Sequence, residues 1–137
     1  MGAEAEGRLN DARALYAEAW DAAADDYEAC VAAHFVARYQ ADASDGLRWN
    51  EIALARAEAA EVAGDARSAG FHASLHLNLG ASYESLGRTV EARAAFARAV
   101  ARLGEVPEGP YRDVVARGVE GGMRRMAAAE RERELLG

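Results

Sequence analysis

Apolar residues recur every three or four positions along most of the chain, the spacing of one face of an α-helix. Within residues 4–23 the recurring positions are Ala12, Leu15, Tyr16, Ala19 and Trp20. A second run carries Tyr27, Val31, His34, Phe35 and Arg38 near one side of a helix. Both runs are too long and too regular for strands, so they predict amphipathic helices.

Short polar and glycine-containing breaks divide the pattern. Asp25 and Asp26 suit the first turn of a helix, whereas Gly64, Gly87 and Gly104 are typical helix terminators. The breaks predict six helices, at about residues 4–23, 25–41, 45–62, 67–86, 89–103 and 111–135. We therefore expect an all-α protein in which residues 1–137 form a single helical domain.

Composition supports helices that pack closely. The 137 residues are 51% hydrophobic, much of it alanine, and only 7% aromatic, with just two prolines. Sheets favour β-branched and aromatic side chains, whereas small alanines let helices approach one another.

The fourth and fifth predicted helices carry a recognisable motif. The run 73–104 contains Asn78-Leu79-Gly80, Tyr83, Gly87, Glu91-Ala92, Phe96, Ala99 and Val100 at fixed spacing. It resembles a tetratricopeptide repeat, whose period of about 34 residues would occupy 73–106. In such a repeat Gly80 and Ala92 let two antiparallel helices touch, Tyr83 and Phe96 fill the space beside them, and Gly87 permits the turn.

The small–large–small pattern of Ala92, Phe96 and Ala99 recurs upstream. It returns around Gly46, Asn50 and Ala53, and again around Ala12, Tyr16 and Ala19. The step from 12 to 46 equals the period of about 34 residues, whereas the step from 46 to 92 is about 12 residues longer. The resemblance implies a lone second helix, a divergent repeat at about 25–61 and the good repeat. The resemblance thus implies a short α-solenoid. The helix 111–135 would cover its end and present a polar outer face. Val114, Val115, Val119, Met123 and Met126 would pack inward.

Two polar residues stand where the repeat normally places bulky apolar ones: Asn50 and His76. Violations of local packing logic tend to lie at functional or strained sites. We expect these two residues and their neighbours to form one connected polar group on or beneath the concave face. The candidate ligand-binding residues are His34, Arg38, Trp49, Asn50, His76 and Asn78. The structural alternative is a buried hydrogen-bond network that only specifies packing.

Metal or catalytic chemistry has little support. His72 and His76 share one helix face at a usable ligand spacing, with His34 as a conceivable third ligand, but no carboxylate lies at ligand spacing beside them. No nucleophile elbow or phosphate-binding loop is present. Cys30 lies in an apolar stretch without a local base, so we expect a buried, inert thiol. We expect no cofactor, no metal and no catalytic residues.

Charge and hydropathy restrict the partners. The net charge is −7, and an acidic chain repels phosphate backbones, so we expect no nucleic acid partner. No apolar run reaches the roughly 18 residues of a membrane span, and the N-terminus lacks a signal-peptide pattern, so we expect no membrane partner and a cytoplasmic protein.

The resemblance implies a protein-interaction module that binds a peptide or partner protein in a concave groove lined by the first helices of the repeats. Groove contacts would come from His34 and Arg38, and from Ser74, Leu77, Asn78, Ala81 and Glu84. Arg38 with Asn78 would hold a carboxylate. Two alternatives stay open: a small-molecule or metal-binding protein, with or without catalysis, built on the His/Arg/Trp/Asn cluster, and a homodimeric structural module.

Overall fold

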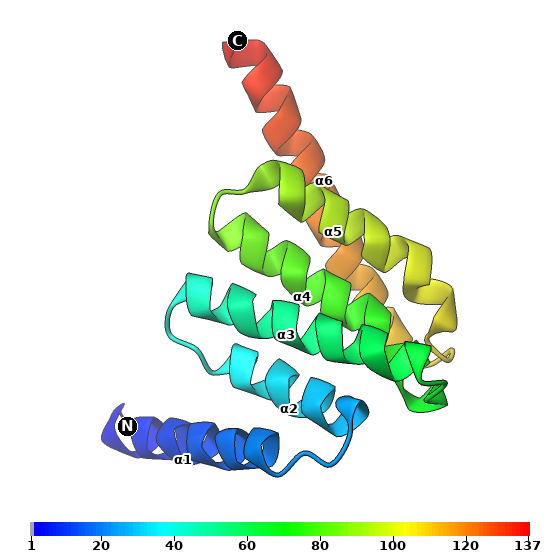
Figure 1. The fold of residues 1–137 in the computed structure, drawn as a ribbon. Helices are drawn as coiled ribbons and strands as arrows, with labels where there is room; N and C mark the ends of the chain where they lie inside the picture. Colours follow the sequence, from blue (N-terminus) through cyan, green and yellow to red (C-terminus); the bar gives the residue numbers. More distant parts are fainter. Residues whose placement is uncertain (1) are drawn as a thin grey trace. The chain divides into compact units, whose positions relative to one another are not determined.

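The computed structural model describes residues 2–137 and confirms the all-α prediction. Residues 2–137 contain six α-helices, two short 3₁₀ segments and no strand (Figure 1). The elements are α1 (Gly2–Asp21), α2 (Asp26–Arg38), α3 (Ala43–Val62), η1 (Ala66–Phe71), α4 (His72–Ser85), α5 (Thr89–Arg102), η2 (Leu103–Glu105) and α6 (Pro110–Leu136). None of the helices in this range combines the length and apolarity needed to cross a bilayer.

The chain forms two compact units, Met1–Ser68 and Ala69–Gly137. In the first unit α2 and α3 form an antiparallel pair joined by a short loop (Figure 1). Both helices begin at an aspartate cap, because Asp25 accepts a hydrogen bond from the Glu28 amide and Asp42 accepts one from Ser44. Their buried side chains are mostly alanine, so the two helices can approach closely.

Helix α1 docks in the first unit through aromatic rings. Tyr16 stacks on Phe35 and Tyr39 of the α2 end, with ring centroids 4.8 and 5.5 Å away. Trp20 meets Trp49 of α3 edge-on at 5.3 Å. The expected apolar face of α1 is therefore only partly right: Leu15 is 61% exposed, because it lies one helical step away from Tyr16.

The second unit is organised around the ring of Phe96 on α5. A Cβ placed on Gly80 of α4 would lie 2.5 Å from this ring, and one placed on Gly122 of α6 would lie 2.6 Å from it. The two glycines therefore hold an aromatic ring between three helices. The sequence expectation that Gly80 permits close approach is confirmed, although its neighbour is the Phe96 ring rather than a helix backbone. Gly87, with φ of 72°, makes the α4–α5 turn as expected.

Helix α6 covers the α4–α5 pair, as expected for a cap. Val115 and Val119 join Ala73, Ala99 and Val106 in one buried cluster. Val114 was expected inward but is 58% exposed, since a single helical step separates it from Val115. Arg117, Glu120 and Arg124 give α6 a polar outer face, and its last turns extend past the α4–α5 turn (Figure 1).

The fourth helix begins later than the pattern predicts. Residues 66–71 form a 3₁₀ segment, and the α-helix starts at His72 rather than at Arg67. The carboxylate of Asp65 accepts a hydrogen bond from the Arg67 amide, and the Ser68 hydroxyl donates to the Asp65 carbonyl. Such local side-chain hydrogen bonds compete with α-helical pairing and favour the tighter turn.

Candidate functional site

Four of the six predicted site residues lie in the first unit, and two lie in the second. His34 and Arg38 are on α2, Trp49 and Asn50 are on α3, and His76 and Asn78 are on α4. Their union in one polar group stays a prediction. The surroundings of each residue within its own unit define what it can do.

A mixed stripe runs along α2. Tyr27, Val31, His34 and Arg38 stand three or four residues apart, so they share one side of the helix. The first three are half-buried, and Arg38 is exposed at the last turn. The His34 ring meets Phe35 edge-on at 5.1 Å, and burial, followed by the charge of Arg38, lowers the pKa of His34. We call these four residues the α2 stripe.

Arg38 is exposed, and among the residues whose side chains the structure describes no hydrogen bond or ion pair involves its guanidinium. Several other arginines are held in place, for example Arg93 by Glu130 and Arg125 by Glu84. Arg38 is therefore available to bind an external carboxylate, for which a guanidinium supplies two parallel donors.

On α3, Asn50 is buried and Trp49 is half-buried. The edge-on contact with Trp20 shows that the Trp49 ring anchors α1 to α3. Trp49 therefore contributes to helix packing, a role that the sequence pattern did not indicate.

On α4, His72 and His76 are both buried, and Asn78 is half-buried. Among the described residues Nδ1 of His76 has no hydrogen-bond partner. Burial, the charge of His72 and then those of Arg98 and Arg102 lower the pKa of His76 to about 4. His76 is therefore neutral at pH 7.

The other predicted groove residues of α4 mostly have internal contacts. The Ser74 hydroxyl donates a hydrogen bond to the Phe71 carbonyl. Leu77 packs against Gly118 of α6, so closely that a Cβ on this glycine would lie 2.8 Å from Leu77 Cδ2. Glu84 binds Arg125 of α6 through bonds of 2.6 and 3.0 Å. Of this set only Ala81 is exposed. The α4–α6 surface is thus a closed, ion-paired surface rather than an open row of ligands.

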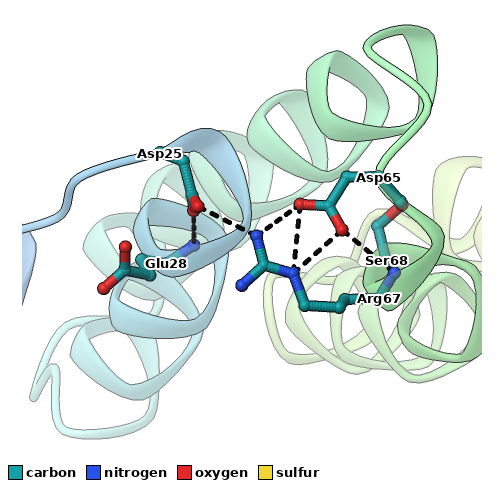
Figure 2. Close-up of polar contacts among 5 residues, drawn as sticks. All are labelled: Asp25, Glu28, Asp65, Arg67 and Ser68. Atoms are coloured by element: carbon teal, nitrogen blue, oxygen red, sulfur yellow. Dashed lines mark hydrogen bonds and ion pairs between the residues drawn. The ribbon is translucent and has the colours of Figure 1, made fainter.

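A charged cluster that sequence analysis missed lies where α2 begins. Figure 2 shows the guanidinium of Arg67 between the carboxylates of Asp25 and Asp65. Nη2 of Arg67 lies 2.9 Å from Asp25 Oδ2 and 2.5 Å from Asp65 Oδ2. The same guanidinium lies 4.4 Å from the Tyr27 ring centroid. The cluster ties the η1 segment to the cap of α2, across 42 residues of sequence.

An open pocket of about 320 Å³ lies beside this cluster, between the ends of α1, α2 and α3. Its walls are Trp20, Ala23, Ala24, Asp25, Asp26, Ala29 and Arg56. The Arg56 guanidinium lies 5.5 Å from the Trp20 ring centroid, and its Nη1 is 3.0 Å from Asp26 Oδ1. The pairing of Trp20 with residues 26 and 56 needs the tertiary fold, so no sequence motif reveals it.

Residues 2–137 hold no group of three or more His, Cys, Asp or Glu side chains placed to bind a metal ion. Cys30 is fully buried, and burial raises its pKa to about 12, so its thiol stays protonated. The expectation of a buried, inert thiol is confirmed.

Comparisons with protein-family models, with curated proteins and with solved structures gave no match. The contacts described above and the repeat-like motif of residues 73–104 are therefore the features from which a function can be inferred.

Proposed function

We propose that the protein is an interaction module that holds a segment of a partner protein against α2, the first helix of the α2–α3 pair. Two features support the proposal. The α2–α3 and α4–α5 hairpins have the antiparallel arrangement that the repeat resemblance implies. The α2 stripe ends at the exposed guanidinium of Arg38 and carries half-buried Val31 and His34 beside it, whereas the Tyr27 ring at its other end lies under Arg67.

Arg38 is the observation that carries the proposal. An exposed arginine without an internal partner contributes little to folding, yet it ends a half-buried stripe that provides apolar contact area. Small apolar anchors next to one charged group are typical of peptide recognition, because apolar area provides affinity and the charge selects the partner. We infer that Arg38 binds a carboxylate of the partner, either a chain terminus or an acidic side chain.

The test begins with capture of partners on the immobilised full-length protein, followed by titration of each purified partner. We expect Arg38→Ala to weaken binding by about ten- to a hundredfold, as for loss of a charged hydrogen bond. Arg48→Ala is the matched control, because Arg48 is exposed on α3 of the same unit and has the same charge. A partner that binds the Arg38 variant as tightly as the unmodified protein contradicts the proposal.

The two alternatives predict other outcomes. A homodimeric module would sediment as a dimer without a partner, and a small-molecule binder would be stabilised by metabolites in a thermal-shift screen. Either result without a protein partner would displace the interaction-module proposal.

A further inference from the structure

The two units differ sharply in charge. Residues 1–68 contain 14 acidic residues and 6 arginines, a net charge of −8, whereas residues 69–137 contain 9 acidic residues and 10 arginines, a net charge of +1. The acidity of the protein thus belongs to the first unit. A surface with this excess attracts basic partners and repels acidic ones.

Acidic side chains of the first unit also line the pocket beside Trp20. Asp25 and Asp26 contribute two carboxylates to its walls and Arg56 contributes one guanidinium group, whereas Arg67 binds Asp25 from outside the pocket. The lining side chains thus carry a net charge of −1, and Trp20 contributes an indole ring to the same walls. Carboxylate and aromatic face together are the two groups that bind guanidinium best, through paired hydrogen bonds and cation–π attraction.

The protein itself shows which ligand suits these walls. Arg56 lies over Trp20 and contacts Asp26, and Arg67 lies over Tyr27 and contacts Asp25, so the same arrangement occurs twice. Nη1 of Arg56 contacts Oδ1 of Asp26, whose side chain is still 37% exposed. Three of the lining residues are alanines with short side chains, so a volume of about 320 Å³ stays open beside Arg56. They are Ala23, Ala24 and Ala29.

We propose that the pocket beside Trp20 binds an arginine side chain of a partner chain, with its guanidinium on the Trp20 ring and on Asp26. The volume lies at the lower end of the range for small-molecule sites, which suits one side chain better than a larger cofactor. Arg56 is then an internal competitor that covers the ring when no partner is bound. The proposal rests on the proposed function, because it assigns chemistry to the partner.

The test uses the 137-residue chain with Trp49→Phe, which keeps an aromatic ring against Trp20 and leaves Trp20 as the only tryptophan. Trp20 emission is followed while an end-blocked Gly-Gly-Arg-Gly-Gly peptide is added at low ionic strength. The citrulline analogue, which has the same shape without the charge, is the ligand control. We expect the arginine peptide to change the emission at millimolar concentration and the citrulline peptide to leave it unchanged.

Two pairs of variants in this background separate the pocket from general electrostatics. Asp26→Asn is compared with Asp45→Asn, since both aspartates stand in the first turn of a helix in the same unit. Arg56→Ala is compared with Arg48→Ala, which makes the same charge change on the same helix. We expect Asp26→Asn to bind about fivefold more weakly than Asp45→Asn, and Arg56→Ala to bind about two- to fivefold more tightly than Arg48→Ala.

Equal affinities within both pairs would overturn the proposal, because the peptide would then respond to net charge alone. Binding of free arginine as tightly as the peptide would overturn the assignment to a partner chain. Circular dichroism of each variant verifies folding.

The two proposals fail separately. A captured partner that depends on Arg38 would support the interaction module even if the arginine peptide shows no preference for the pocket. If the arginine peptide changes Trp20 emission but no partner is captured, the arginine site is supported and the proposed role of the α2 stripe is contradicted.

Discussion

At the scale of single residues, Gly122 and its neighbour Gly121 have opposite environments on the same helix. A Cβ on Gly122 would lie 2.6 Å from the Phe96 ring, whereas one on Gly121 would meet only the flexible end of Arg125 at 3.2 Å. We expect Gly122→Ala to destabilise the protein by about 1–3 kcal/mol through overpacking. Gly121→Ala should be neutral or stabilise it by up to about 1 kcal/mol, because alanine favours helices. Urea unfolding followed by circular dichroism measures both, and equal effects would contradict the packing described for Phe96.

The burial of His76 should make the stability of the fold depend on pH. Its folded-state pKa of about 4 lies below the ordinary value of 6.5, so the unfolded chain takes up the proton first. The neutral imidazole therefore stabilises the fold above pH 6.5, and this stability is lost as the pH falls towards 4. The expected loss is on the order of 2–3 kcal/mol. In His76→Gln the free energy of unfolding should vary less between pH 7 and pH 4. An unchanged slope would assign the acid sensitivity to other groups.

Arg38 and His34 are coupled through charge. Burial is the larger cause of the lowered pKa of His34, and Arg38 is the second. We expect Arg38→Ala to raise the His34 pKa while leaving it below 6.5, and Arg48→Ala to leave it unchanged. An NMR titration can resolve this because the chain has only three histidines.

At the scale of elements, the Asp25 carboxylate joins the start of α2 to η1. It caps α2 through the Glu28 amide and binds Arg67 (Figure 2). Both bonds lower the pKa of Asp25, and the hydrogen bond from Glu28 contributes most. Asp25→Asn keeps a capping oxygen but removes the ion pair, whereas Asp25→Ala removes both. We therefore expect the melting temperature to fall further for Asp25→Ala than for Asp25→Asn, and the reverse order would contradict the capping role.

Helix α6 supports its neighbours only along its first part. Val115, Val119 and Met126 are buried, whereas residues 131–137 are exposed. Deletion of 111–137 should uncover the Phe96 and Val106 clusters and lead to unfolding or aggregation. Deletion of 131–137 alone should leave the urea midpoint nearly unchanged. A shortened chain without residues 111–137 that is as stable as the full chain would contradict the capping function.

At the scale of the whole molecule, the two units differ in core as well as in charge. The second unit buries Phe96, Leu75 and three large side chains of α6, whereas the first is filled mainly by alanine. Apolar area removed from water grows with side-chain size, so the second unit has the larger intrinsic stability. We expect fragment 69–137 to unfold cooperatively in urea and fragment 1–68 to be less stable. Similar midpoints for the two fragments would contradict this difference between the cores.

The sequence by itself determined the all-α class and the number of α-helices. Helical periodicity, interrupted at Gly64, Gly87 and Gly104, was enough to place six helices, since these signals act within a few residues. The burial of Cys30 and of the α6 core residues Val115 and Val119 was also predictable, because it follows from which side of a helix a residue occupies.

Only the tertiary structure decided which residues far apart in the sequence contact one another. It placed Arg67 between Asp25 and Asp65, set Arg56 over Trp20, and put Gly122 of α6 against Phe96 of α5. It also showed that Val114 lies outside the core and that η1 precedes α4. The physical reason is one of range. Helix formation is governed by neighbours three or four residues away, whereas a pocket depends on the packing of several helices, which no local pattern specifies.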